Sequence, residues 1–105
     1  MDANGMKFED FQIGDVISFV RNFTLEDFKS FSALSGDTNL LHGSDEFAVK
    51  AGQSQAIAPL MLAASPLSAM VGNGFGQHRT LILSVRLQAL QPTPYQLDIT
   101  YSAKI

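Results

Sequence analysis

Three stretches of this chain have the residue pattern of β-strands. Residues 16–23 are rich in β-branched and aromatic side chains, which favour strands. Residues 83–89 alternate between apolar and polar side chains, and residues 95–105 do the same. A proline-containing turn at 91–94 separates these two stretches, so we predict that they form an antiparallel hairpin.

A helical pattern follows the first predicted strand. The apolar residues that recur at helical spacing, and that we predict to form one buried stripe, are Leu25, Phe28, Phe31 and Leu34. Thr24 stands at the expected N-cap, and Asp27 stands three residues later, as in a capping box. Gly36 can adopt a positive φ and is expected to end the helix.

A long apolar region occupies residues 56–72, after a short predicted helix at 44–50 that Ser44 caps. The region is rich in Ala, Leu and Met, which predicts a helix buried on most sides. Pro66 is difficult to place, because a proline inside a helix costs about 3 kcal/mol. Either the helix kinks at Pro66, or Ser65 caps a new helix that begins with Pro66.

The alternation of the last predicted strand still continues at Ile105. Three strands and one buried helix are few for a stable sheet, and an open sheet edge favours aggregation. We therefore interpret residues 1–105 as a single domain, and we hypothesise that it is the first part of a longer domain or of a fusion protein.

Composition limits the functions that these 105 residues can have. The net charge of −3 and the scattered Lys and Arg residues argue against binding of nucleic acid. There is no cysteine and there are only 2 histidines, so we expect no metal site and no cofactor. No apolar run is long enough to span a bilayer, so we expect a cytoplasmic protein. Charged residues make up only 16%, which predicts that a second subunit or another domain covers part of the surface.

Asp37 and His42 are the residues best suited to chemistry, because they lie on an irregular stretch directly after a predicted helix. A carboxylate and an imidazole that share one water molecule can take a proton from it and return a proton elsewhere. A plainer interpretation is that residues 36–39 form an ordinary turn in which Asp37 bonds its own backbone, with His42 on the surface. On these residues alone, the plainer interpretation is favoured.

The surroundings of this pair resemble a known family. A capped helix is followed by the sequence L-S-G-D-T-N-L-L-H at residues 34–42, then by an apolar helix and by alternating strands. This order resembles that of the MaoC-like hydratases of the hot-dog fold, which include (R)-specific enoyl-CoA hydratases. The likeness runs from Phe8 to Ile105, and residues 34–42 are its most specific part.

The resemblance implies an α+β fold in which an antiparallel sheet wraps around a central buried helix. Members of this family are lyases of fatty acid metabolism. They add water to trans-2-enoyl thioesters or remove it from 3-hydroxyacyl thioesters, and they usually dimerise through the sheet. The resemblance therefore implies a homodimer whose partner is a thioester of coenzyme A or of acyl carrier protein, and neither nucleic acid nor a membrane.

The resemblance also implies roles for single residues. Asp37 and His42 fall on the Asp and His that hold and activate the water, and Asn39 falls on the Asn that shapes their loop. The substrate-binding residues expected around the start of the apolar helix are Leu60, Met61 and Ser65. In the family, a backbone N–H at this helix start polarises the thioester carbonyl, which suits the positive end of a helix. From the residues alone, Met61 is a core residue and Ser65 a helix cap.

The chain departs from the family at that helix start, where the family usually carries His-Gly-Met. Here the residues are Pro59, Leu60 and Met61. Leu60 still offers an N–H, but its side chain stands where a glycine lets the substrate approach the backbone, and Pro59 offers no donor.

Two other functions remain open on the same fold. The first is a non-catalytic hot-dog module for dimerisation or acyl-chain binding, often fused to another enzyme, and the second is an acyl thioesterase. His78 and Arg79 are candidates to meet the phosphates of coenzyme A or of another anionic carrier, or are an exposed loop pair without that role.

Overall fold

The chain folds into two compact units. A computed structural model of the protein describes residues 8–75 and 80–105. The described residues of the first unit are 8–21, 65–75, 80–87 and 100–105. Those of the second unit are 22–64 and 88–99.

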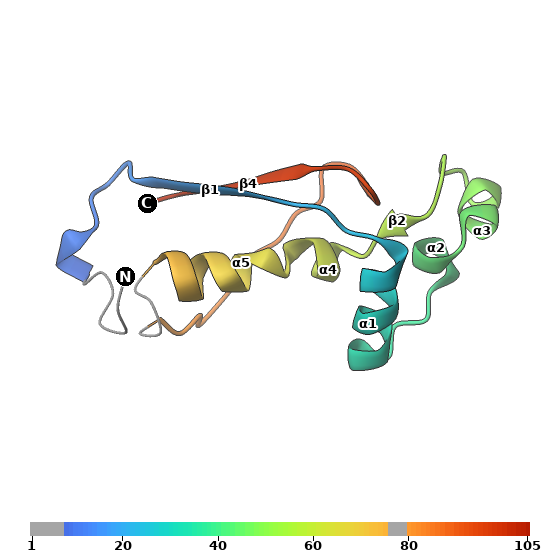
Figure 1. The fold of residues 1–105 in the computed structure, drawn as a ribbon, viewed down its shortest axis with the longest axis horizontal. Helices are drawn as coiled ribbons and strands as arrows, with labels where there is room; N and C mark the ends of the chain where they lie inside the picture. Colours follow the sequence, from blue (N-terminus) through green and yellow to red (C-terminus); the bar gives the residue numbers. More distant parts are fainter. Residues whose placement is uncertain (1–7, 76–79) are drawn as a thin grey trace. The chain divides into compact units, whose positions relative to one another are not determined.

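The first unit contains a two-stranded sheet, whose strands run side by side in Figure 1. The strands are β1 (Val16–Arg21) and β4 (Ile99–Lys104). The Ile105 N–H donates to the Asp15 carbonyl at 2.9 Å, so the end of β4 meets the beginning of β1, as in an antiparallel pair. The rings of Phe19 and Tyr101 stack with their centroids 5.5 Å apart, which is the kind of side-chain pair that stabilises a sheet.

The first unit also contains short helical segments. They are the 3₁₀ helix η1 (Phe8–Asp10), helix α5 (Pro66–Ala69) and the π-helical turn η2 (Met70–Gly74). Met70 is only 3% exposed and is a core residue. Phe11 and Phe75 meet edge to face at 5.5 Å. A Cβ atom at Gly74 would collide with the Ile17 side chain, so the absence of a side chain at Gly74 allows η2 to lie against β1.

Helix α1 (Leu25–Ser35) opens the second unit, and it begins and ends as predicted. Thr24 Oγ1 accepts a hydrogen bond from the Asp27 N–H at 3.3 Å, and Asp27 Oδ2 accepts one from the Thr24 N–H at 2.8 Å. Gly36 has a φ of 82°, and its N–H donates to the Ser32 carbonyl. Because both ends are satisfied by neighbouring residues, the boundaries of α1 follow from its local sequence.

The rest of the second unit consists of short elements. They are α2 (Leu40–Gly43), α3 (Asp45–Lys50), β2 (Ile57–Ala58), α4 (Leu60–Ala64) and β3 (Thr93–Pro94). Ser44 Oγ accepts from the Phe47 N–H at 3.1 Å and caps α3, as predicted. Strands β2 and β3 pair antiparallel, with Ile57 opposite Pro94. The buried residues of this unit include Phe23, Phe28, Ala48, Ala56, Ala58, Leu62, Ala63 and Tyr95.

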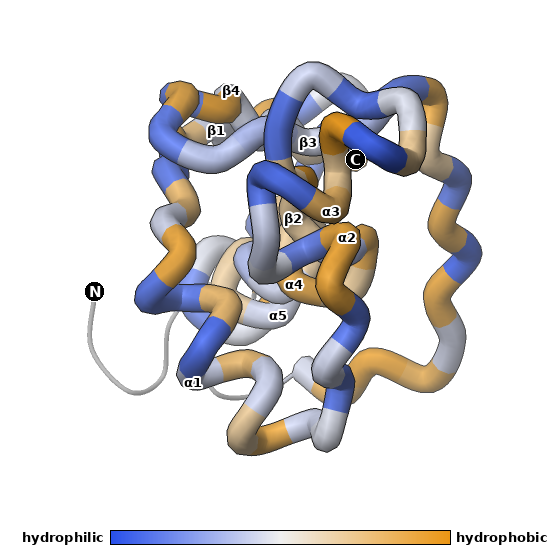
Figure 2. The backbone as a smooth tube through the Cα atoms, turned by 90° about the vertical axis from the view of Figure 1, so that its right-hand side faces the viewer, coloured by the Kyte–Doolittle hydropathy of each residue, from blue (hydrophilic) through white to orange (hydrophobic). Residues whose placement is uncertain are grey.

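The predicted hairpin of residues 83–89 and 95–105 is wrong. Residues 83–89 form no strand, although the alternation of hydropathy along the trace is visible in Figure 2. The second stretch supplies β4, which pairs with β1, and the predicted turn at 91–94 contains β3. Alternation determines which side chains share a face of a strand, but it does not determine the strand with which the backbone pairs.

The predicted buried stripe of α1 is only partly buried. Phe28 is 7% exposed, whereas Leu25 is 39% and Leu34 is 90% exposed. Phe31 is half-buried. Helical spacing places these four residues on one face, but burial requires a neighbour, and Phe28 has one because the His42 ring packs against it.

The predicted helix over residues 56–72 is divided into shorter elements. β2 occupies its beginning, and α4 starts after Pro59. Pro66 is the first residue of α5, where its missing N–H is not needed. Ser65 has helical backbone angles, and its side chain makes no capping hydrogen bond, so the prediction of Ser65 as a cap is wrong.

Burial in α4 also differs from the prediction of a helix covered on most sides. Leu62 and Ala63 are buried, but Leu60 is 41% and Met61 is 63% exposed, so Met61 is not a core residue. Among the described residues, no helix is long and apolar enough to cross a membrane.

Candidate functional site

The segment from Asp37 to His42 is a tight turn followed by helix α2. Asp37 Oδ1 accepts a hydrogen bond from the Asn39 N–H at 3.0 Å, so the turn anticipated from the sequence is present. Asn39 Oδ1 in turn accepts from the Leu41 N–H at 2.9 Å and caps α2. Asp37 is half-buried, and within the described structure only its Oδ1 is occupied by the turn.

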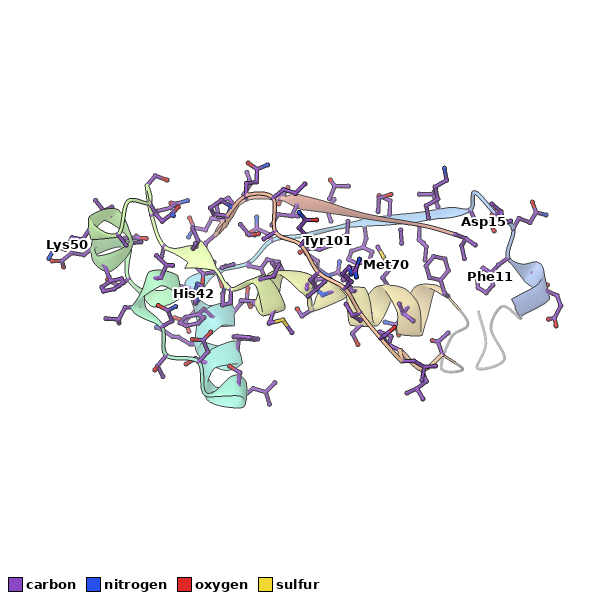
Figure 3. The ribbon with its side chains drawn as sticks, turned by 180° about the vertical axis from the view of Figure 1, so that it is seen from behind. Phe11, Asp15, His42, Lys50, Met70 and Tyr101 are labelled. Carbon is purple, nitrogen blue, oxygen red and sulfur yellow. The ribbon has the colours of Figure 1, made fainter. Side chains whose placement is uncertain are left out.

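The ring of His42 is fixed by β2, next to which it lies in Figure 3. Its Nδ1 lies 2.8 Å from the carbonyl oxygen of Ile57. A carbonyl oxygen can only accept, so Nδ1 carries the proton in this hydrogen bond. The neutral ring then keeps its lone pair on Nε2, which is therefore the nitrogen that can act as a base.

An aromatic contact from α1 also holds this imidazole. The ring of Phe28 lies 5.8 Å from the ring of His42, centroid to centroid, at an interplanar angle of 60°. A Cβ atom at Gly43 would lie 3.1 Å from Cε2 of Phe28, which is closer than side chains normally pack. The glycine that follows His42 therefore lets the Phe28 ring approach α2.

Tyr95 follows β3 directly and contacts the same helix. Its hydroxyl donates to the backbone carbonyl of His42 at 2.7 Å, and its side chain is 9% exposed. Burial, together with the negative charge of Asp37, raises the pKa of Tyr95 to about 12. At neutral pH the hydroxyl therefore remains protonated and can donate. Tyr95 thus bonds the backbone of His42, and its pKa is affected by the charge of Asp37.

A pocket of about 410 Å³ lies beside His42 in the second unit. It is lined by His42 and Leu60, by the two residues of β2, and by residues 89–93. Most of the lining is apolar, and His42 is the only lining residue whose side chain ionises. Such a pocket suits an apolar ligand whose polar end meets the imidazole.

The residues expected to bind substrate do not all meet at this pocket. Leu60 lines it, whereas Met61 does not. Asn39 and Asp37 are also not part of the lining. Ser65 belongs to the first unit. The structure therefore brings Leu60 and His42 to the same pocket.

Two partners of His42 were missed at the level of the sequence. Ile57 binds His42 through its backbone carbonyl, and the pattern of side chains in a sequence does not predict such a contact. Tyr95 is 53 residues from His42 and stands in the sequence as one member of an alternating stretch. Both partners lie in β2 or directly after β3, and no local sequence pattern predicts that these two strands pair.

In the part of the chain that the structure describes, no group of three or more His, Asp or Glu residues could hold a metal ion. His78 and Arg79, the candidates for contact with an anionic carrier, lie outside the described residues.

Comparison with known sequences identifies a family over most of the chain. Residues 10–98 match the MaoC like domain family. No curated protein sequence matches the chain significantly.

Solved structures similar to this chain include two hydratases. One is the (R)-hydratase from A. caviae involved in PHA biosynthesis, with 24% identity and a TM-score of 0.86, over 91% of this chain and 73% of that one. The other is the R-hydratase PhaJ1 from Pseudomonas aeruginosa, with 22% identity and a TM-score of 0.84, over 92% of this chain and 63% of that one. Similarity at this level shows the fold, so the predicted α+β hot-dog fold is confirmed.

A third similar structure is the monoamine oxidase regulatory protein from Archaeoglobus fulgius. It is 29% identical, with a TM-score of 0.78, over 94% of this chain and 69% of that one. The chain thus spans between 63% and 73% of the length of these three proteins.

Proposed function

Because the chain belongs to the MaoC-like domain family, we propose that it is a hydratase or dehydratase that acts on acyl thioesters. The substrates would be trans-2-enoyl thioesters, to which water is added, or 3-hydroxyacyl thioesters, from which it is removed. The observation that carries this proposal is the state of His42. Its Nδ1 is engaged by the Ile57 carbonyl, so Nε2 is the basic nitrogen of a residue that lines an apolar pocket.

The proposed chemistry needs one base and one acid, which His42 and Asp37 would supply between them. In hydration, one of the pair takes a proton from water, and the oxygen forms a bond to C3 of the enoyl group. The electrons of the C2–C3 double bond shift toward the thioester carbonyl as an enolate, and the other member of the pair then gives a proton to C2. Dehydration follows the same steps in reverse.

The enolate oxygen requires a hydrogen-bond donor, and the backbone N–H of Leu60 is the candidate in this chain. Leu60 is the first residue of α4 and lines the pocket together with His42. Donors that are fixed before the reaction stabilise charge that develops in the transition state. Pro59 contributes no donor, so Leu60 would do this without help from the residue before it.

Enoyl-CoA hydration, measured as the loss of enoyl absorbance, tests the proposal. We expect Asp37→Asn and His42→Asn each to lower kcat by about 10²-fold or more, because general acid–base groups contribute about 10²- to 10⁴-fold. Glu46→Gln is the matched control, since Glu46 is an exposed carboxylate of the same unit that pairs with Lys50 on the surface. Full activity in Asp37→Asn and His42→Asn would contradict the assignment, and release of free thiol would indicate thioester hydrolysis instead.

A second candidate function, non-catalytic binding of an acyl chain, is favoured by the Leu60 side chain. This side chain occupies part of the pocket wall beside His42, where the family usually has glycine. If it hinders the thioester, Leu60→Ala should lower KM for a short enoyl thioester severalfold. Met61→Ala is the control, because Met61 is exposed and does not line the pocket. Binding of acyl-CoA without turnover, in both the wild type and Leu60→Ala, would favour the non-catalytic module.

The identity of the carrier and the location of the protein remain predictions. We expect coenzyme A or acyl carrier protein as the carrier, and the cytoplasm as the location. Hydration rates with the same enoyl group on each carrier would distinguish the two.

A further inference from the structure

Tyr95 contacts His42 of the proposed acid–base pair, yet it does not line the pocket. Its hydroxyl donates to the His42 carbonyl at 2.7 Å. Its side chain is 9% exposed, so this hydrogen bond is partly shielded from water. A shielded bond of this kind restricts α2, the four-residue helix that carries His42.

Two hydrogen bonds hold His42 from outside α2, one from β2 and one from the residue that follows β3. β2 provides the Ile57 carbonyl, which holds Nδ1, and Tyr95 immediately follows β3. Ile57 is opposite Pro94 in the antiparallel register, and Tyr95 is the residue directly after Pro94, where β3 ends. The Ile57 carbonyl in β2 thus binds the imidazole of His42, and the Tyr95 hydroxyl, after the end of β3, binds the backbone of the same residue.

The segment after Tyr95 is itself anchored to the chain that leads into α1. The N–H of Gln96 donates to the Phe23 carbonyl at 2.8 Å. The Asn22 side-chain amide donates to Asp98 Oδ1 at 2.9 Å. Two hydrogen bonds therefore fix the segment from which the Tyr95 side chain extends, so the tyrosine is a rigid support and not a side chain on a free loop.

We propose that Tyr95 is a positioning residue of the active site, which holds α2 so that His42 keeps its Nδ1 on Ile57 and its Nε2 ready for the water. The proposal rests on the proposed function, since it concerns the same acid–base pair. Small displacements of catalytic groups lower rates strongly, by as much as about 10²-fold for a shift of about 1 Å.

Tyr95→Phe tests this role, because it removes the hydroxyl and keeps the buried ring. The first measurement is the ¹⁵N NMR signal of the imidazole at about pH 8.5. In the wild type we expect the signature of a ring protonated at Nδ1, and His42→Asn identifies the signal among the 2 histidines. In Tyr95→Phe we expect the shifts to move toward those of an unrestrained imidazole that exchanges between tautomers.

The second measurement is enoyl thioester hydration. We expect Tyr95→Phe to lower kcat by about 10- to 100-fold and to leave KM within about twofold, because the hydroxyl does not line the pocket. Tyr101→Phe is the matched control. It makes the same chemical change in β4 of the first unit, and it should leave the His42 signal and kcat unchanged.

The outcomes separate this inference from the proposed function. Unchanged imidazole shifts in Tyr95→Phe overturn the positioning role, whatever happens to kcat. Shifted signals with unchanged kcat in an active protein overturn it as well. Shifted signals together with a lower kcat support it. Shifted signals in a protein whose wild type hydrates no enoyl thioester support the hold on His42 and overturn the proposed function alone.

Discussion

Gln96 is the residue other than glycine, within the described chain, that has a positive φ, at 58°. This left-handed conformation costs a residue with a side chain roughly 1–2 kcal/mol. The strain is retained because the Gln96 N–H bonds the Phe23 carbonyl and leads the chain away from Tyr95. The segment that supports the proposed site thus contains a strained backbone position at Gln96.

Gln96→Gly should therefore raise the free energy of unfolding by about 0.5–1 kcal/mol, since glycine adopts positive φ without strain but loses more chain entropy on folding. Urea denaturation of both proteins measures the difference. Gln88→Gly is the control, because Gln88 has no positive φ and the substitution should stabilise nothing. A loss of stability in Gln96→Gly would contradict the presence of strain.

Tyr95 also predicts a specific pH dependence of stability. Its hydroxyl ionises near pH 10.0 in an unfolded chain and near pH 12 in the folded protein. Below the lower value both states are protonated, and the tyrosine has no effect on the pH dependence. Between the two values the unfolded state releases the proton first, so the free energy of unfolding falls as pH rises.

We expect the free energy of unfolding of the wild type to fall more steeply between pH 10.0 and about 12 than that of Tyr95→Phe. Urea melts at several pH values measure both slopes. Tyr101 remains in both proteins, and its own raised pKa, which is caused mainly by burial, contributes equally to each. Equal slopes would show that Tyr95 is not shielded from water.

At the scale of single elements, α1 is the part of the chain that its own sequence determines most fully. The capping box of Thr24 and Asp27 and the left-handed Gly36 are formed by residues within one turn of each helix end. Such interactions need no distant partner, so their residue types predict them. Strands β2 and β3 are the opposite case. Each has only two residues, and each is a strand because it pairs with the other.

Thr24→Ala should lower the free energy of unfolding by about 0.5–2 kcal/mol, because the N–H of Asp27 loses its acceptor. Urea denaturation measures this loss, and circular dichroism checks that the helix content survives. Ser30→Ala, on the exposed surface inside the same helix, is the control and should be neutral or slightly stabilising. A loss in Ser30→Ala equal to that in Thr24→Ala would argue against a specific role of the cap.

At the scale of the whole molecule, the described structure leaves an alternating segment without a partner strand. Residues 81–89 form no strand, and several of their large side chains are exposed, with Leu81 at 81%, Leu83 at 89% and Val85 at 60%. An extended, apolar and unpaired stretch is a site at which another chain can add a strand. Together with the low content of charged residues, this segment supports our expectation of a homodimer.

We therefore expect the protein to sediment as a dimer, and Leu83→Lys to shift it toward the monomer by placing a charge on residues 81–89. Sedimentation velocity at two protein concentrations measures this. Leu34→Lys is the control, because Leu34 lies in α1 with a similar exposure of 90%. A monomeric wild type, or equal dissociation of both variants, would contradict a dimer formed through residues 81–89.

The structural features that could be predicted from the amino-acid sequence are those that depend on neighbouring residues. The sequence predicted the limits of α1, the Ser44 cap of α3, the strand β1 and the Asp37 turn, because local hydrogen bonds and side-chain shape decide these features. It also indicated the family through residues 34–42, where the order of Gly, Asp, Asn and His is itself the signal.

The contacts between helices and strands could not be predicted from the sequence and are seen in the tertiary structure. The partner of β4 is β1 and not residues 83–89, and Phe28 is the buried residue of its helix because the His42 ring covers it. The two hydrogen bonds that hold His42 join residues 15 and 53 positions apart. Contacts over such separations follow from the packing of the whole chain, and a local pattern of hydrophobic and polar residues does not encode them.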